Sequence, residues 1–157
     1  MPSGTINGST GNEYIDAKIE WSTTPNTMLN YTTVTAALYY KRNNTGYTTY
    51  GTGTFSITIN GETTSASKTL TITENGWVKA VEATQKISHR GSMTIGISAS
   101  GSIPDTSLSS TSVSGAIALD AIAESMAGST IDSLSCDTTY FNGKMTYKYT
   151  PKWSNYY

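Results

Sequence analysis

The feature that most constrains the fold is an alternation of apolar and small polar side chains in residues 86–119. Residues 93–99 and 113–119 each place an apolar or very small side chain at every second position. Since successive side chains of a β-strand point to opposite faces, each run has one apolar and one small polar face. Residues 101–105 carry the Gly, Pro and Asp that reverse a chain, and a turn at 90–91 ends an earlier strand. This stretch therefore predicts three consecutive antiparallel strands.

The same alternation continues through most of the preceding chain. Turn-forming sequences interrupt it at 25–26, 43–46, 60–61 and 74–76, and Asn-Gly at 60–61 is a strong hairpin signal. The further predicted strands are 14–21, 31–42, 48–52, 54–59, 62–73 and 77–85. Short strands at such regular spacing indicate a sandwich or barrel rather than a fold with crossover helices. We expect residues 1–122 to form one all-β domain, an antiparallel β-sandwich of the jelly-roll or immunoglobulin-like type.

The apolar face of each predicted strand defines the expected core. These side chains share the parity that places them on one face of their strand. The inward-facing set is Ile15, Ile19, Trp21, Val34, Leu38, Phe55, Ile57, Leu70, Ile72, Val81, Ile95, Ile97, Val113, Ile117 and Leu119.

Residues 123–157 are expected to start a second unit. Residues 119–127 contain helix-forming side chains and end before a glycine, which favours a short linker at the domain boundary. Alternation returns in 131–136 and 144–150, with Asn-Gly at 142–143 as a turn. Because two strands cannot build a core alone, we interpret this part as the linker and β-hairpin of a second, truncated module.

Charge and hydropathy exclude several classes of partner. The net charge is −1, from ten basic and eleven acidic residues, and no basic run is present, so binding to nucleic acid is not expected. No apolar run approaches the roughly 20 residues that span a bilayer, and the first residues lack the features of a secretion signal. We therefore expect no membrane partner and synthesis in a cytoplasm.

The sequence carries no catalytic, metal or cofactor signature. Cys136 and His89 are each the one residue of their type, which leaves no disulfide framework and no metal-ligand cluster. Asp16 and Glu20 share a strand face, but four residues of strand span roughly 13 Å, beyond the separation of carboxylates in glycosidases. We expect a protein that is not an enzyme, with no cofactor.

Aromatic side chains around one turn give the remaining functional signal. Tyr39, Tyr47 and Tyr50 surround a turn that contains Asn43 and Asn44. Exposed rings stack on the apolar face of a sugar while amide groups bond its hydroxyls, so these five residues are the candidate glycan site. The alternative is that the tyrosines only cover a sheet surface, with their hydroxyls in water.

Three segments carry a family resemblance. They read I-S-H at 87–89, I-x-I-S-A-S-G-S-I at 95–103 and T-S-V-S-G-x-I-x-L at 111–119. This pattern resembles minor structural proteins of siphophages of Gram-positive bacteria, found in tail fibres and baseplates, and the likeness covers roughly residues 3–122. The resemblance implies a place in the virion, other tail or baseplate proteins as partners, and it leaves homo-oligomerisation open.

Two functions follow from these observations together. The first is a non-enzymatic module at the host-facing end of the phage tail or baseplate that binds cell-wall polysaccharide. The alternative is a rigid spacer or assembly module that has no ligand of its own.

Overall fold

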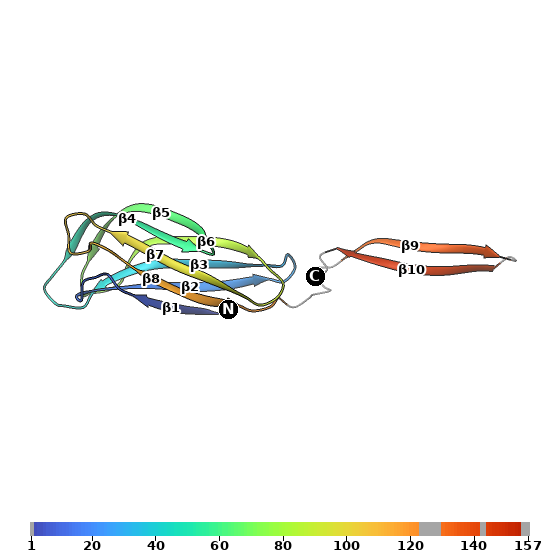
Figure 1. The fold of residues 1–157 in the computed structure, drawn as a ribbon, viewed down its shortest axis with the longest axis horizontal. Coiled ribbons are helices and arrows are strands. Elements are labelled where there is room, and N and C mark those ends of the chain that lie inside the picture. Colours follow the sequence, from blue (N-terminus) through green and yellow to red (C-terminus); the bar gives the residue numbers. More distant parts are fainter. Residues whose placement is uncertain (1, 123–129, 142–143, 155–157) are drawn as a thin grey trace.

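The computed structural model describes residues 2–122, 130–141 and 144–154. The first part is a sandwich of two antiparallel four-stranded sheets (Figure 1). One sheet has the order β1-β2-β3-β6, formed by β1 (Ser3–Gly8), β2 (Ile15–Asn26), β3 (Tyr31–Arg42) and β6 (Val78–Ser88). The other has the order β5-β4-β7-β8, formed by β4 (Thr49–Ile59), β5 (Glu62–Ile72), β7 (Met93–Ser102) and β8 (Val113–Leu119). The predicted antiparallel β-sandwich is confirmed.

The strand order favours the immunoglobulin-like alternative over the jelly roll. Without β1, a sheet of β2, β3 and β6 faces a sheet of β5, β4, β7 and β8. This is the order of a seven-stranded immunoglobulin domain, except that the fourth strand of the seven, β5, pairs with the third instead of the fifth. The strand β1 is an addition that pairs with β2 at the sheet edge.

Three details of the strand prediction are wrong. Residues 25–26, predicted as a turn, belong to β2, where Pro25 pairs with Thr32 of β3, so this strand extends five residues beyond the predicted end at residue 21. The strands β7 and β8 pair as expected, but β6 pairs with β3 in the opposite sheet, so residues 89–92 cross between sheets instead of forming a hairpin. The predicted strands 48–52 and 54–59 form one continuous strand, β4, that pairs with β5 along its whole length. The sequence correctly marks residues 89–92 as a connection, but it does not show which strand pairs with β6. The break predicted at residue 53 does not interrupt β4.

The core lies between the sheets and consists of the predicted side chains with one difference. Every predicted core residue except Trp21 is buried to 5% exposure or less, and Tyr40 and Phe55 add a ring contact with centroids 5.7 Å apart. Full burial of each such side chain contributes about 1.5–3 kcal/mol. Trp21 is only partly buried and packs at the rim of the core, against the edge strand β1.

The edges of the two sheets are covered where they meet. Ser9 and Ser112 exchange two backbone hydrogen bonds of 3.0 and 2.8 Å, which join the end of β1 to the start of β8. At the opposite edge, Lys68 of β5 donates to the carbonyl oxygen of Lys79 of β6 at 2.8 Å. These contacts join the two sheets at both sides of the sandwich.

The Asn-Gly hairpin is confirmed in its backbone geometry. Asn60 and Gly61 have φ values of 49° and 85° between β4 and β5. Two successive positive φ values match the right-handed twist of the paired strands, and Asn and Gly adopt them at low cost.

The second described part is a two-stranded ladder. The strands β9 (Thr130–Phe141) and β10 (Lys144–Ser154) are antiparallel, with an irregularity between Lys152 and Trp153. The expected linker at residues 123–129 and the expected turn at 142–143 lie outside the described residues. The division into two modules therefore stays a prediction.

Candidate functional site

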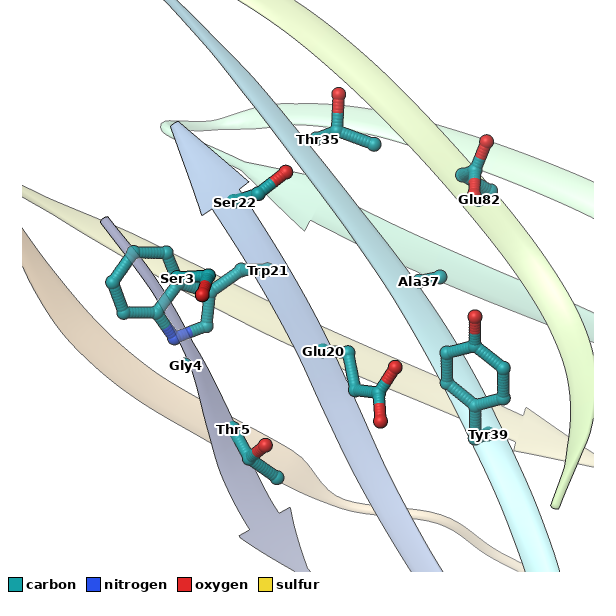
Figure 2. A pocket seen from close by; sticks show the side chains of 10 residues that line it. All are labelled: Ser3, Gly4, Thr5, Glu20, Trp21, Ser22, Thr35, Ala37, Tyr39 and Glu82. Carbon is teal, nitrogen blue, oxygen red and sulfur yellow. The ribbon is translucent and has the colours of Figure 1, made fainter. Parts of the chain in front are cut away.

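A groove of about 430 Å³ lies on the outer face of the first sheet (Figure 2). Its floor is a row of direct cross-strand partners, in which Thr5, Glu20, Ala37 and Glu82 come from β1, β2, β3 and β6. Ala37 is the smallest side chain of the row and is itself buried, so the surface is depressed between the two glutamates. The strand register therefore creates the groove, because it places an alanine between longer side chains.

The walls of the groove are aromatic on one side and hydroxylated on the other. Tyr39 of β3 stands on one side of Ala37, and Thr35 stands on the other (Figure 2). The hydroxyl of Thr35 lies 3.0 Å from that of Thr84 on β6. Trp21 also lines the groove, with its indole against the backbone of Gly4, where a Cβ atom would lie 2.8 Å from the ring.

Two lysines next to Tyr39 pair with the two glutamates. Lys18 Nζ lies 2.7 Å from Glu20 Oε1, and Lys79 Nζ lies 2.7 Å from Glu82 Oε2. The hydrogen bond and the charge of Glu82 raise the pKa of Lys79. Both ammonium groups lie near the Tyr39 ring, at 5.8 and 6.0 Å from its centroid. The carboxylates are therefore fixed and neutralised locally.

Trp77 extends the aromatic side of this surface. Its ring is 38% exposed, and Lys18 Nζ lies 4.2 Å from its centroid. Cations attract aromatic faces at such distances. The lysine thus links the rings of Tyr39 and Trp77 on the outer face of the sheet.

The two glutamates of the groove lack the surroundings of a catalytic acid. A carboxyl group that serves as a general acid is held in an apolar, desolvated environment. The side chains of Glu20 and Glu82 are 48% and 47% exposed, and each contacts a lysine. Asp16, the other carboxylate considered in the sequence, accepts a hydrogen bond from Asn43 at 3.1 Å. Both groove carboxylates are therefore solvent-exposed ions that already have a lysine partner.

The five residues predicted from the sequence are spread over the sandwich. Tyr39 lines the groove, while Tyr50 is 65% exposed on β4 of the other sheet, and Tyr47 is 63% exposed in the loop between them. Asn43 donates to the carbonyl of Glu13 at 2.7 Å, and Asn44 accepts from Arg42 at 2.9 Å. Both asparagines therefore fix the loop, and their role in ligand binding stays a prediction.

Most residues of the groove could not be identified from the sequence alone. Glu20, Trp21 and Glu82 meet Tyr39 only through strand pairing, so their distance in the sequence hides their proximity. No signal in a single sequence fixes that register.

The described residues contain no cluster of three or more His, Cys, Asp or Glu side chains able to hold a metal ion. Within the same ranges, no helix has the length and hydrophobicity that a membrane span requires.

Comparisons of the chain with protein-family models, with curated proteins and with solved structures found no match.

Proposed function

We propose that the chain is a non-enzymatic structural module of a siphophage tail or baseplate, at the host-facing end, and that its groove binds cell-surface carbohydrate. The virion context comes from the sequence resemblance. The carbohydrate ligand comes from one observation: the Tyr39 ring stands beside Glu20 and Glu82 in an open groove on a rigid sheet. Its volume lies in the range of small-ligand sites, roughly 300–1,000 Å³.

The charge of the groove favours a neutral sugar. Each glutamate already has a lysine partner at 2.7 Å, so an uncharged ligand leaves no new unpaired charge. The free lone pairs of the carboxylates and the hydroxyls of Thr5 and Thr35 can bond sugar hydroxyl groups. Tyr39 supplies the apolar face on which a pyranose ring stacks.

A single site of this kind binds weakly. One stacked ring contributes on the order of 1 kcal/mol beyond area burial. An affinity near 1 mM corresponds to about −4 kcal/mol. Many copies on one particle raise the overall avidity through effective concentration, which suits an adhesion module of a virion.

The second candidate is the rigid spacer, and the other sheet favours it. Hydroxyl side chains of β4 and β5 bond one another across the strands, as in the pairs Ser56–Ser65 and Thr58–Thr63, each at 2.7 Å. Such self-satisfied pairs stabilise the sheet and leave fewer groups free for a ligand.

The test is binding of a multivalent display of the full chain to neutral polysaccharides and to cell walls of Gram-positive bacteria. Tyr39→Ala should weaken binding about fivefold per site, the equivalent of 1 kcal/mol. Tyr50→Ala removes an equally large, exposed ring from the other sheet and is the matched control, with Tyr47→Ala as the variant for the loop.

Several results would count against this proposal. With Tyr39→Ala unaffected, loss of binding in Tyr47→Ala would move the site to the loop, and loss in Tyr50→Ala would move it to β4 of the other sheet. Equal binding by all variants would place the ligand outside these three tyrosines, and no binding by any of them would leave the spacer as the function. Hydrolysis of a bound polysaccharide would refute the non-enzymatic assignment.

A further inference from the structure

Arg42 is a buried cation at the end of β3. Its side chain has the same parity as Leu38 and Tyr40, so it points between the two sheets, and the residue is 6% exposed. Its Nη1 group donates to Thr49 Oγ1 at 2.5 Å, and its Nε donates to Asn44 Oδ1 at 2.9 Å. Both acceptors are neutral, so they orient the guanidinium without balancing its charge.

No carboxylate in residues 2–122 forms an ion pair with Arg42. Asp16 belongs to the neighbouring strand β2, but it lies on the outer face, where Asn43 holds it. The partner of Arg42 in that strand is Ile15, a core residue. A buried charge without a counter-charge is unfavourable, which makes an unpaired guanidinium of this kind a strong attractor for an anion.

The guanidinium also keeps free donors that a ligand can reach. It carries five N–H groups, and the described contacts use two of them. Its Nη2 has no hydrogen bond within the described residues, and it is not completely buried. The Nη2 edge is therefore not completely sealed from solvent, although the residue as a whole is 6% exposed.

Side chains from the loops after β3 and β7 lie around this edge. The exposed ring of Tyr47 lies over the guanidinium, with its centroid 5.6 Å from Cζ. Ser107, in the loop between β7 and β8, places its hydroxyl 3.5 Å from that of Thr49. The loops after β1, β3 and β7 meet at this end of the sandwich (Figure 1). We call Arg42, Asn44, Tyr47, Thr49 and Ser107 the Arg42 site.

We propose that the Arg42 site binds an oxyanion, the carboxylate or phosphate group of an anionic glycan. A guanidinium matches the planar spacing of two such oxygens and can donate two parallel hydrogen bonds. The hydroxyls of Thr49 and Ser107 are further donors, and Tyr47 offers a face for the sugar that carries the anion. The site goes beyond the groove, which suits neutral sugars, and lies at the loop end of the sandwich.

Titration of the full chain, followed by NMR at constant ionic strength, tests this inference. The probes are inorganic phosphate, glucuronate and, as the neutral control, glucose, with chloride as the background anion. Phosphate or glucuronate should shift the Arg42 Nε–H and Asn44 amide signals with a saturable, millimolar midpoint. Phosphate alone would assign a phosphodiester glycan, and glucuronate alone a uronic acid.

Variants distinguish the contribution of the bidentate guanidinium geometry from that of its charge. Arg42→Lys keeps the charge and loses the bidentate geometry, so the midpoint should rise at least tenfold; Tyr47→Ala should weaken glucuronate more than phosphate. Tyr39→Ala, in the groove, should leave both midpoints unchanged, so failure of the groove and failure of this site are distinguishable.

The inference is overturned if neither anion gives a saturable shift at Arg42 in the wild type. It is equally overturned if chloride reproduces the shifts, or if the shifted signals are those of Lys18 and Lys79. Because these outcomes are read in the wild-type protein, they do not depend on the folding of any variant.

Discussion

Replacement of Tyr40 by Phe should destabilise the protein at neutral pH and stabilise it at high pH. Tyr40 is fully buried beside Phe55, and its hydroxyl lies 2.5 Å from that of Thr111 in the loop before β8. Burial raises the pKa of Tyr40 to about 12, against the smaller opposing effect of the hydrogen bond to Thr111. In the unfolded chain the same group titrates near its ordinary value of about 10.

The sign follows from proton binding. Between about pH 10 and pH 12 the unfolded chain loses the Tyr40 proton while the folded protein keeps it, so stability falls as pH rises. Two pKa units correspond to about 3 kcal/mol in total. Tyr40→Phe lacks this titration but loses a buried hydrogen bond, a cost of about 1 kcal/mol.

The wild type should therefore be more stable by about 1 kcal/mol at neutral pH. It should be less stable by about 2 kcal/mol well above pH 12, with the two curves crossing at about pH 11. Other groups titrate in both proteins and cancel in the difference. Urea unfolding followed by tryptophan fluorescence, from neutral pH to about pH 11.5, covers this crossing, provided that the m-values agree. A difference that stays constant across this range would refute the argument, because it would mean that Tyr40 titrates alike in both states.

Two further substitutions test the core and its rim. Ile97→Asp places a charge at a position that is 1% exposed and should unfold the sandwich. Ser98→Asp, on the exposed face of the same strand, should change the melting temperature little. Equal melting temperatures of the two variants would contradict the core assignment. Gly4→Ala adds a Cβ atom 2.8 Å from the Trp21 ring, so the indole must move; we expect a loss of about 1 kcal/mol in the free energy of unfolding and a change in tryptophan emission. Gly91→Ala, with no atom near its Cβ, should change neither quantity. An unaltered emission spectrum of Gly4→Ala would contradict the packing of Trp21 against Gly4.

The parts of the fold that depend on local chemistry could be predicted from the sequence. Alternation places Ile57 and Ile97 in the core, and Asn60-Gly61 forms the expected hairpin because its residues tolerate positive φ. These features are decided within a few residues of chain.

The choice between the two sheets could not be predicted in the same way. The strands β6 and β7 show similar alternation, and residues 89–92 carry ordinary turn chemistry, yet the two strands belong to opposite sheets. Pairing of β6 with β3 is decided by packing between segments about 50 residues apart, for which one sequence holds no local signal.

The candidate sites show the same division. Alternation requires Tyr39 and Tyr40 to face opposite ways, and the structure buries Tyr40 and places Tyr39 in the groove. The parity that buries Tyr40 also predicts an inward Arg42, a signal available in the sequence. The sequence could not show that no carboxylate lies opposite Arg42, because this depends on which strand pairs with β3.

The two chain ends of the sandwich, residues 2 and 122, lie at the same pole, and this has a mechanical consequence. Pro2 and Ile122 line the same small cavity, and the Pro2 carbonyl accepts a hydrogen bond from the Thr23 backbone at 2.9 Å. A force that pulls on residues 2 and 122 therefore acts on the first bonds of the β1–β2 and β7–β8 ladders one at a time, and should peel these strands away. A load applied to the opposite pole, at the loop after β3, would instead run along whole strands and stress many bonds together. The sandwich is thus built to resist tension between its loop end and its chain ends far better than tension between the two chain ends themselves.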